Sequence, residues 1–504
     1  MQLWKLSSWF SITIKKRITN LFPFGILITT FLVVNQNAVF RPQLWSDDFM
    51  IVRDAHSKIN LTWTQTIADL RPISAIFLNY AVGFIGKESD VWILHAFASV
   101  GIILLTLSIY QFLRKREHTQ GFALTLSASL ICLPTFQEYV YFATASVFAW
   151  ICWLSLVSYN FLSSVKRLRP TAGVTILIFC FLCYPPAAFF GLALLSVDVL
   201  QKGLKTNRFS VVNSLKDYRI ILIGYAVAAI LSYICAITIK VVLEVPLALR
   251  TQMVSNPRDV FSKVKWVLTR LVATEFRPFA VSTSSMILLL FSVSIGLGFY
   301  FFALLKLRKQ KFSGWLAFLI TLPLIPIMSA AANMIPRENQ FEFRTLPGLA
   351  FGGIYLIFYS LSQLSLWRVG SNLKRKKYSQ IFIALILLVP VGCNAIAQSS
   401  ELWFNPSSVR DSVISHFDPQ VDENVCIVLP KSLNVPLKRL GMWSQRTDLV
   451  SQWTTDSILY FVGRRHGRTY KVTEVVDTSS QCLPNHSILD FSQLMIVGHQ
   501  RFIY

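Results

Sequence analysis

The sequence predicts a polytopic α-helical membrane protein with about eleven transmembrane helices and a small C-terminal α/β domain outside the cytoplasm. Of its 504 residues, 54% are hydrophobic and only 14% are charged, whereas soluble domains carry about 25% charged residues. The apolar residues recur in blocks of roughly 20, the length that a helix needs to cross a hydrocarbon core about 30 Å thick. Short basic segments separate many of these blocks, which is typical of the same class.

The apolar blocks define the expected helices. They occupy residues 21–40, 91–112, 120–134, 141–162, 171–184, 187–200, 220–239, 281–302, 314–333, 346–363 and 379–397. Blocks 120–134, 171–184 and 187–200 are short for a span and are candidates for tilted, broken or re-entrant helices. The first block follows Lys15-Lys16-Arg17 but is not followed by a small-residue cleavage site. We therefore interpret it as an uncleaved helix and not as a signal peptide.

Basic residues predict the orientation of the chain. Half of the 48 Lys and Arg residues fall in six short segments, where only Glu117 and Asp217 oppose them. The segments are 1–20, 113–119, 163–170, 201–219, 303–313 and 364–378. With these helices all six segments lie on one side of the membrane, and the positive-inside bias makes that side cytoplasmic. The net charge of +23 is then a topology signal, because a nucleic-acid site needs one contiguous basic face.

The predicted domains are a multi-pass membrane domain and a tail. The membrane domain covers residues 1–397 and includes a first outer loop at 41–90, whereas the tail covers residues 398–504. Both the loop and the tail are expected on the extracytoplasmic side, where the sequence also has its longest segments outside the apolar blocks. The cytoplasmic segments are too short for a catalytic domain and hold no Gly-rich phosphate loop, which argues against an ATP-driven pump.

The tail is expected to fold as a small domain of its own. Residues Val425–Leu429 and Ile458–Val462 are typical of buried strands. Six of the eight cysteines lie in or beside apolar blocks, whereas Cys426 and Cys482 lie in the tail. An oxidising compartment would allow a disulfide between these two, so they are the disulfide candidates.

The first outer loop carries a pair of acidic residues close to the membrane boundary. Asp47 and Asp48 follow the first apolar block, and Arg71-Pro72 precedes the apolar stretch Ile73–Ile85. That stretch is too short to span, so it predicts a helix lying in the outer interface. A carboxylate in this position could take a proton from a hydroxyl group that attacks a lipid-linked substrate. The alternative is that both aspartates only cap a helix over 49–58 or solvate the loop.

The order of these features resembles the GT-C superfamily of membrane glycosyltransferases, which use polyprenyl- or dolichyl-phosphate sugars. The features are a first helix, an outer Asp47-Asp48 pair, an interfacial helix that opens with Arg71-Pro72, and a helix that ends in Arg114-Lys115-Arg116. Within that superfamily the chain is most similar to the bacterial and phage O-antigen glucosyltransferases. The resemblance covers roughly residues 15–400. It implies an outer-face active site, an inverting displacement at the anomeric carbon, and Asp47 or Asp48 as the catalytic acid of the loop.

Four further residues are candidates for substrate binding. Glu138 is expected in the turn between the third and fourth helices, where many GT-C enzymes place a second polar residue; its alternative is a solvated loop residue. Arg344 opens a helix directed into the membrane and could bind the donor's phosphate through two parallel hydrogen bonds. Its alternative is snorkelling or a salt bridge with a neighbouring glutamate. The remaining two candidates are Arg71, which precedes the apolar stretch of the first outer loop, and Arg337, which lies in the same outer segment as Arg344.

The sequence predicts no cofactor. The seven histidines lack the spacing of a transition-metal site, although the carboxylates of Asp47, Asp48 and Glu138 could converge on a divalent ion. The predicted partners are a polyprenyl-phosphate sugar donor, a glycan or lipid-linked acceptor and membrane lipid, with no nucleic acid.

The main hypothesis is a hexosyltransferase, moving glucose as the resemblance suggests, in the inner or plasma membrane with a cytoplasmic N-terminus and a periplasmic tail. The alternatives are a transporter or flippase of lipid-linked sugars, and a polymerase or ligase of surface polysaccharide. Against a transporter, the sequence shows no inverted repeat and few charges deep in the helices.

Overall fold

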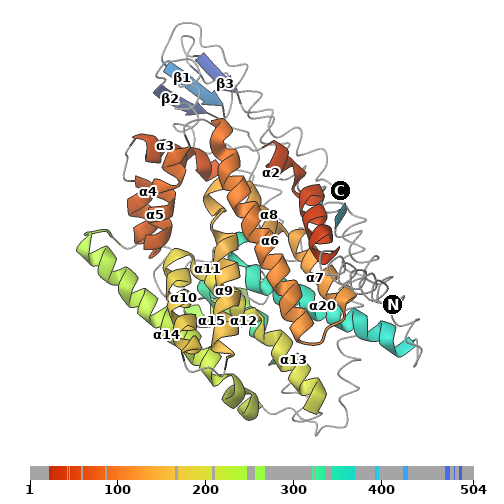
Figure 1. Cartoon of the computed structure of the whole chain (residues 1–504). Helices are drawn as coiled ribbons and strands as arrows, with labels where there is room; N and C mark the ends of the chain where they lie inside the picture. The colour runs from red at the N-terminus through yellow and green to blue at the C-terminus, as the bar shows by residue number, and fades with distance from the viewer. Residues whose placement is uncertain are drawn as a thin grey trace, which may run out of the picture.

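In the computed structural model, the described part of the chain is mostly helical (Figure 1). The described residues are 22–41, 44, 46–57, 61–85, 88–164, 168–206, 211–246, 256–266, 321–322, 324–334, 343–368, 392–393, 395–396, 424–428, 471–476, 482 and 487–490. Among these residues, three helical segments are long and apolar enough to cross a membrane: Trp92–Lys115, Ala143–Leu162 and Leu215–Val242. The prediction of a helical chain with segments suited to cross a membrane is confirmed for these three segments. Expected blocks 281–302 and most of 379–397 lie outside the described residues.

The first expected span is a bent helix. Its apolar part covers Phe22–Val34, the chain bends at Asn35, and α2 (Gln36–Phe40) continues beyond the bend. The Asn35 amide group donates to the carbonyl oxygen of Phe31 at 3.3 Å. Because an asparagine side chain competes for backbone groups, it explains a bend that hydropathy alone does not indicate.

Before η2 (Glu88–Val91), the described part of the first outer loop folds into short helical pieces. They are α3 (Ser46–Ser57), α4 (Leu61–Ala68), α5 (Pro72–Tyr80) and the 3-10 turn η1 (Val82–Phe84). Pro72 occupies the first turn of α5, where a missing N–H costs nothing. The apolar stretch expected as a non-spanning helix over 73–85 is thus helical and interrupted near residue 81.

Two membrane-length segments pack beside each other in the centre. The first is α6 (Trp92–Lys115), which follows η2 (Glu88–Val91). The second is α9 (Phe148–Leu162), preceded by the 3-10 turn η3 (Ala143–Ala145). Trp153 Nε1 of α9 donates to Ser108 Oγ of α6 at 3.0 Å.

Between them the chain forms α7 (Gln120–Ile131) and α8 (Pro134–Tyr141). The side chain of Thr119 accepts the N–H of Phe122 at 3.3 Å and so caps the start of α7. Residues 135–140 were expected as a turn between the blocks 120–134 and 141–162, but α8 is a helix in which every residue is buried. This prediction was wrong because Pro134 occupies the first helical turn and does not end a helix there.

The short block 187–200, which was a candidate for a tilted, broken or re-entrant helix, is broken. After α10 (Arg169–Cys183) come the short helices α11 (Pro185–Ala188) and α12 (Phe190–Ala193), and then α13 (Leu195–Thr206). Ser155 Oγ of α9 accepts the N–H of Gly191 at 2.8 Å and also bonds the carbonyl oxygen of Ala188. One side chain therefore satisfies backbone groups that the break exposes, as buried irregular backbone requires.

The longest helix is α14 (Val211–Val242), with 32 residues. At 1.5 Å per residue it is about 48 Å long and extends beyond the predicted block 220–239 at both ends. Later described elements are α15 (Pro257–Trp266), α19 (Ala331–Met334), the 3-10 turn η8 (Phe343–Thr345) and α20 (Pro347–Arg368).

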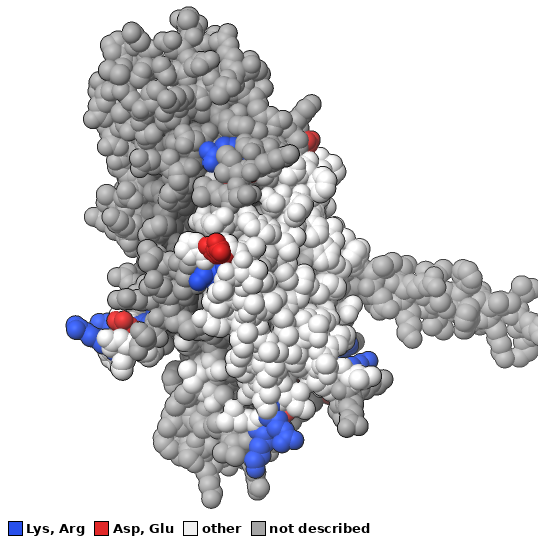
Figure 2. All heavy atoms as spheres, turned by 90° about the vertical axis from the view of Figure 1, so that its left-hand side faces the viewer, with Lys and Arg blue, Asp and Glu red and all other residues white. Residues whose placement is uncertain are grey.

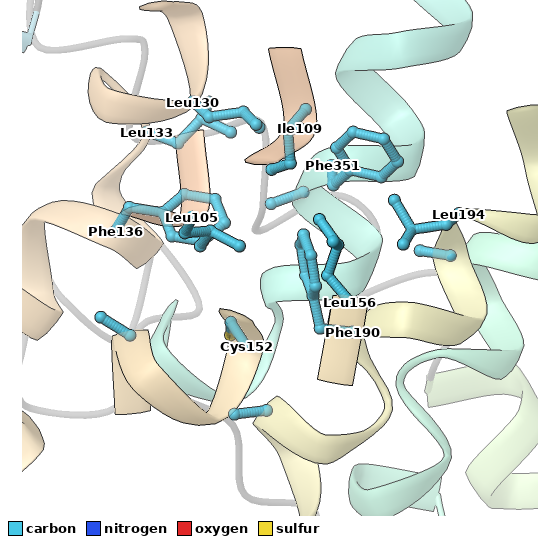
Figure 3. Packing of buried hydrophobic residues seen from close by; sticks show 14 of the residues in the cluster. Leu105, Ile109, Leu130, Leu133, Phe136, Cys152, Leu156, Phe190, Leu194 and Phe351 are labelled. Atoms are coloured by element: carbon cyan, nitrogen blue, oxygen red, sulfur yellow. The ribbon is translucent and has the colours of Figure 1, made fainter. Parts of the chain in front are cut away.

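One large apolar core joins α6, α7, α8, α9, α12 and α20. Figure 3 shows Phe190 of α12 beside Leu156 of α9 and near Phe351 of α20. The ring centroids of Phe190 and Phe351 lie 5.6 Å apart in an edge-to-face arrangement, which aromatic pairs favour. The core holds α20 against helices that lie more than 150 residues earlier in the sequence.

In the tail the structure describes three parallel strands in the order β2-β1-β3. They are β1 (Asn424–Val428), β2 (Lys471–Val476) and β3 (Ser487–Asp490). The expected strand at Val425–Leu429 corresponds to β1, whereas Ile458–Val462 lies outside the described residues. Cys426 of β1 and Cys482 form a disulfide with Cα atoms 5.8 Å apart.

Two of the basic segments meet at one end of the helices. Arg116 Nε lies 2.7 Å from Asp198 Oδ1, Tyr159 Oη donates to Asp198 Oδ2 at 2.7 Å, and Lys202 pairs with Asp217. In Figure 1 this end is at the bottom, and the three strands lie at the top beyond α3. The grouping of segments 113–119 and 201–219 at one end agrees with the sequence pattern.

Candidate functional site

Asp48 caps a turn of the chain almost one hundred residues away. It is the third residue of α3 and is fully buried. Its Oδ2 accepts the N–H of Ala143 at 3.0 Å, and its Oδ1 accepts the N–H of Thr144 at 2.9 Å. The first N–H groups of a helical turn have no partner within the turn, so a carboxylate there supplies hydrogen-bond acceptors. Its negative charge also interacts favourably with the positive end of the turn's dipole. The geometry makes Asp48 an anchor between α3 and η3.

Asp47 precedes Asp48 on the same helix. Of the two, the structure describes the side-chain contacts of Asp48. The backbone of Asp47 belongs to α3, and its side chain lies outside the described part of the chain. The two aspartates that sequence reasoning left equivalent are therefore distinguished by what Asp48 binds.

Glu138 and Arg344 are brought together from positions 206 residues apart. Glu138 is fully buried in α8, and its Oε2 accepts the backbone N–H of Arg344 at 2.8 Å. Arg344 Nε lies 3.7 Å from Glu138 Oε1, and the next residue of α8, Tyr139, donates its hydroxyl to the carbonyl oxygen of Arg344 at 2.8 Å. Two side chains of α8 therefore bind the backbone N–H and the backbone carbonyl oxygen of Arg344, and so fix the position of η8.

The guanidinium group of Arg344 remains partly open to the surroundings. Its side chain is 18% exposed, whereas that of Glu138 is 0% exposed. It also lies over the ring of Phe142, with Cζ 5.2 Å from the ring centroid. A planar guanidinium group can bind an anion through parallel hydrogen bonds, and here it is supported by an aromatic face and by a carboxylate.

An aromatic chain connects Arg71 with Arg344. Arg71 lies over the ring of Tyr184 at 5.6 Å and pairs with Asp69 at 2.7 Å. The ring of Tyr184 stacks on Phe148 with centroids 3.6 Å apart, and Phe148 meets Tyr139 edge-to-face at 5.8 Å. Since Tyr139 bonds Arg344, packed rings from α8, α9 and the end of α10 join the two arginines.

Four of the sequence-predicted site residues are thus placed around α8, η3 and η8: Asp48, Glu138, Arg344 and Arg71. Arg337 lies outside the described residues. The expectation that Glu138 sits in an open turn was wrong, because α8 is helical and Glu138 uses one oxygen on a backbone amide and faces a guanidinium with the other. Sequence reasoning missed Tyr139, Phe142 and Phe148 as parts of the site, and their only signal was their closeness in sequence to Glu138.

Among the described residues, no group of three His, Cys, Asp or Glu side chains is arranged to hold a metal ion. The convergence of Asp48 and Glu138 on one ion, which the sequence left open, is not the arrangement in this structure. Each of these carboxylates is instead directed at backbone N–H groups of a different turn.

A second polar cluster lies at the basic end of the helices. His118, between α6 and α7, stacks on Phe122 with centroids 4.7 Å apart, and its Nε2 lies 3.0 Å from Gln201 Nε2 of α13. The hydroxyl group of Tyr355 from α20 lies 3.4 Å from the same ring nitrogen. Burial, assisted by the charge of Arg116, lowers the pKa of His118 from 6.5 to about 4.

The two polar sites lie at opposite ends of one helical segment. The residues that Asp48 caps, Ala143 and Thr144, begin the segment Ala143–Leu162, whereas Tyr159 near its end bonds Asp198 of the basic cluster. The whole 20-residue segment is about 30 Å long at 1.5 Å per residue, comparable to the hydrocarbon thickness of a bilayer. From Ala143 to Tyr159 the rise is about 24 Å at 1.5 Å per residue, so the two polar sites lie near opposite ends of this segment.

No family model matches the chain, and no curated protein sequence shows a significant match to it.

Proposed function

We propose that this protein is a membrane glycosyltransferase that moves a hexose from a polyprenyl-phosphate carrier to a glycan or lipid-linked acceptor. The proposal includes about eleven spans, a cytoplasmic N-terminus and a tail that forms an extracytoplasmic α/β domain. The observation that carries it is the joining of the Asp47-Asp48 helix and Arg344 through α8 and η3, at the end of membrane-length helices opposite the basic clusters. A lipid carrier in the proposed membrane would present its sugar phosphate at this end of the helices.

In the proposed reaction the acceptor hydroxyl attacks the anomeric carbon of the donor sugar. The new C–O bond forms as the bond between that carbon and the phosphate oxygen breaks, and polyprenyl phosphate leaves with the electron pair. A general base takes the hydroxyl proton. Since the carboxylate of Asp48 is engaged by two backbone amides, Asp47 is assigned as the base and Asp48 as the residue that positions α3.

Arg344 is assigned to the donor's phosphate. A guanidinium binds phosphate through two parallel hydrogen bonds and stabilises the charge that the leaving group develops. Glu138 fixes the peptide of Arg344 and sets the direction of its side chain. Arg71 is placed to assist at the other end of the aromatic chain, and Arg337 stays a proposed binder on sequence grounds alone.

The test is transfer of a labelled sugar by purified protein in liposomes that contain a polyprenyl-phosphate hexose and a lipid-linked acceptor. Label appearing on the acceptor supports the proposal. Movement of the donor across the bilayer without bond cleavage would replace it with a flippase, and transfer of whole glycan blocks would replace it with a ligase or polymerase. The matched variants are Arg344→Gln and Arg258→Gln, the latter removing an exposed cation of α15. We expect loss of about 100-fold or more only in the first.

A further inference from the structure

One face of α14 is apolar, exposed and continuous over most of the helix. Its large exposed residues are Ile220 (48%), Ile223 (58%), Val227 (38%), Ile230 (59%), Leu231 (46%) and Ile234 (55%). They recur at intervals of three and four residues, which places them on one side of a helix. Figure 2, which views the molecule from the side of α14, shows a wide uncharged zone on this face. Exposed apolar surface of this extent on a membrane-length helix is suited to contact lipid chains.

Two cations stand at one end of this stripe. Lys216 and Arg219 are exposed, and they precede Ile220 and Ile223 by four residues, so they lie on the same side of α14. The intervening Asp217 pairs with Lys202 of α13. Within the described residues no carboxylate pairs with Lys216 or Arg219. The acidic residue nearest to them in sequence is therefore neutralised by another lysine, and both cations keep their charge for a ligand.

The opposite end of the stripe carries charges of both signs. There Lys240 is accompanied by Glu244, so the two charges offset one another. Among the described residues at the two ends of α14, the end at Lys216 and Arg219 carries the uncompensated positive charge. An amphiphile with an anionic head would accordingly bind at that end and in one orientation.

We propose that Lys216, Arg219 and the apolar stripe above them form a binding site for an anionic phospholipid. The phosphate group contacts the two cations, and the acyl chains lie along Ile220, Ile223, Val227 and Ile230. From Arg219 to Ile230 the helix rises about 16 Å, which equals the length of one leaflet of a bilayer core about 30 Å thick. The inference uses the proposed membrane placement of the chain but not the proposed enzyme activity.

The experiment measures lipid binding to the purified full-length protein. Phosphatidylglycerol or phosphatidylcholine is titrated into detergent-solubilised protein at low salt, and bound lipid is counted by native mass spectrometry. We expect phosphatidylglycerol to bind more tightly, with an affinity that decreases as salt is raised. The double variant K216Q/R219Q should weaken phosphatidylglycerol binding by about 5-fold for each cation, or roughly 30-fold in total, and should leave phosphatidylcholine binding unchanged.

The matched control is R258Q/K265Q, which removes two exposed cations from α15. It should bind phosphatidylglycerol like the unmodified protein. Equal loss in the two double variants would show that net charge alone attracts the lipid, and equal binding of the two phospholipids would show that no anion is recognised; either result overturns the proposal. Circular dichroism and the thermal transition of K216Q/R219Q establish that the variant is folded. Failure of sugar transfer has no bearing on this outcome.

Discussion

At the scale of single residues, the two neighbouring aspartates of α3 should behave differently when each is changed to asparagine. Asp48→Asn presents an NH2 group to one of the two backbone N–H groups of η3, which the carboxylate accepts in the unmodified protein. We expect a loss of about 1–3 kcal/mol in the free energy of unfolding. Asp47→Asn should leave stability nearly unchanged and lower transfer by about 100-fold or more if Asp47 is the base.

Thermal unfolding and initial transfer rates of both variants check this assignment. Full activity in Asp47→Asn would remove Asp47 as the base. An unchanged unfolding temperature in Asp48→Asn would show that the cap of η3 is not needed for the fold.

A second prediction at residue scale concerns Gly191, the second residue of α12, just after the break that follows α11. A Cβ atom there would stand 2.6 Å from the carbonyl oxygen of Ser155 and would overlap the hydroxyl group of Tyr225. Gly191→Ala should therefore destabilise the fold by about 1–3 kcal/mol through overpacking. Gly121→Ala is the control, because nothing lies within 4 Å of its Cβ position. Equal thermal midpoints for the two variants would contradict the close packing of α12 on α9.

At the scale of elements, His118 couples the α6–α7 connection to α13 and α20. Its pKa is about 4 in the folded protein and 6.5 in the unfolded chain. Between these values the unfolded chain binds a proton that the folded protein does not. The contribution of His118 to the free energy of unfolding is therefore fully present above pH 6.5. It decreases as the pH falls toward 4, by about 3 kcal/mol in total.

His118→Gln removes that proton uptake and keeps a polar group facing Gln201 and Tyr355. We expect the unfolding temperature of the unmodified protein to fall more steeply between pH 6.5 and 4.5 than that of the variant. The measurement is thermal unfolding in detergent at a series of pH values. Parallel curves for the two proteins would show that His118 does not set the acid sensitivity of this junction.

At the scale of the whole molecule, the positions of charged groups at the two ends of α6 and α9 predict which side each end faces. Arg41 should be accessible from outside the cell and Lys115 only from the cytoplasm, since both are exposed residues outside the apolar cores of their helices. The test uses Arg41→Cys and Lys115→Cys in a background in which the exposed Cys235 and Cys393 are serine. A membrane-impermeant maleimide added to intact cells should label the first variant alone. Labelling of only the second would invert the topology and remove the proposed outer-face enzyme.

The sequence by itself determined the features that depend on local composition. Block length and basic clusters predicted the helical membrane character, and the shortness of the apolar stretch at 73–85 predicted a helix there that does not span. The cysteines outside the apolar blocks predicted the pair that the structure joins, Cys426 with Cys482. These features need only hydropathy, charge or residue spacing, each of which is readable within a window of the chain.

Only the tertiary structure decided how the polar residues are used. The sequence marked Asp48, Glu138 and Arg344 but could not tell that Asp48 caps η3 or that Glu138 holds the peptide of Arg344. It marked 187–200 as a block that could be tilted, broken or re-entrant, but it could not tell where the break lies, because the backbone groups freed there are satisfied by Ser155, more than 30 residues earlier. The physical reason is common to all three: a buried polar group must find a partner, and which partner it finds depends on packing between segments far apart in the sequence.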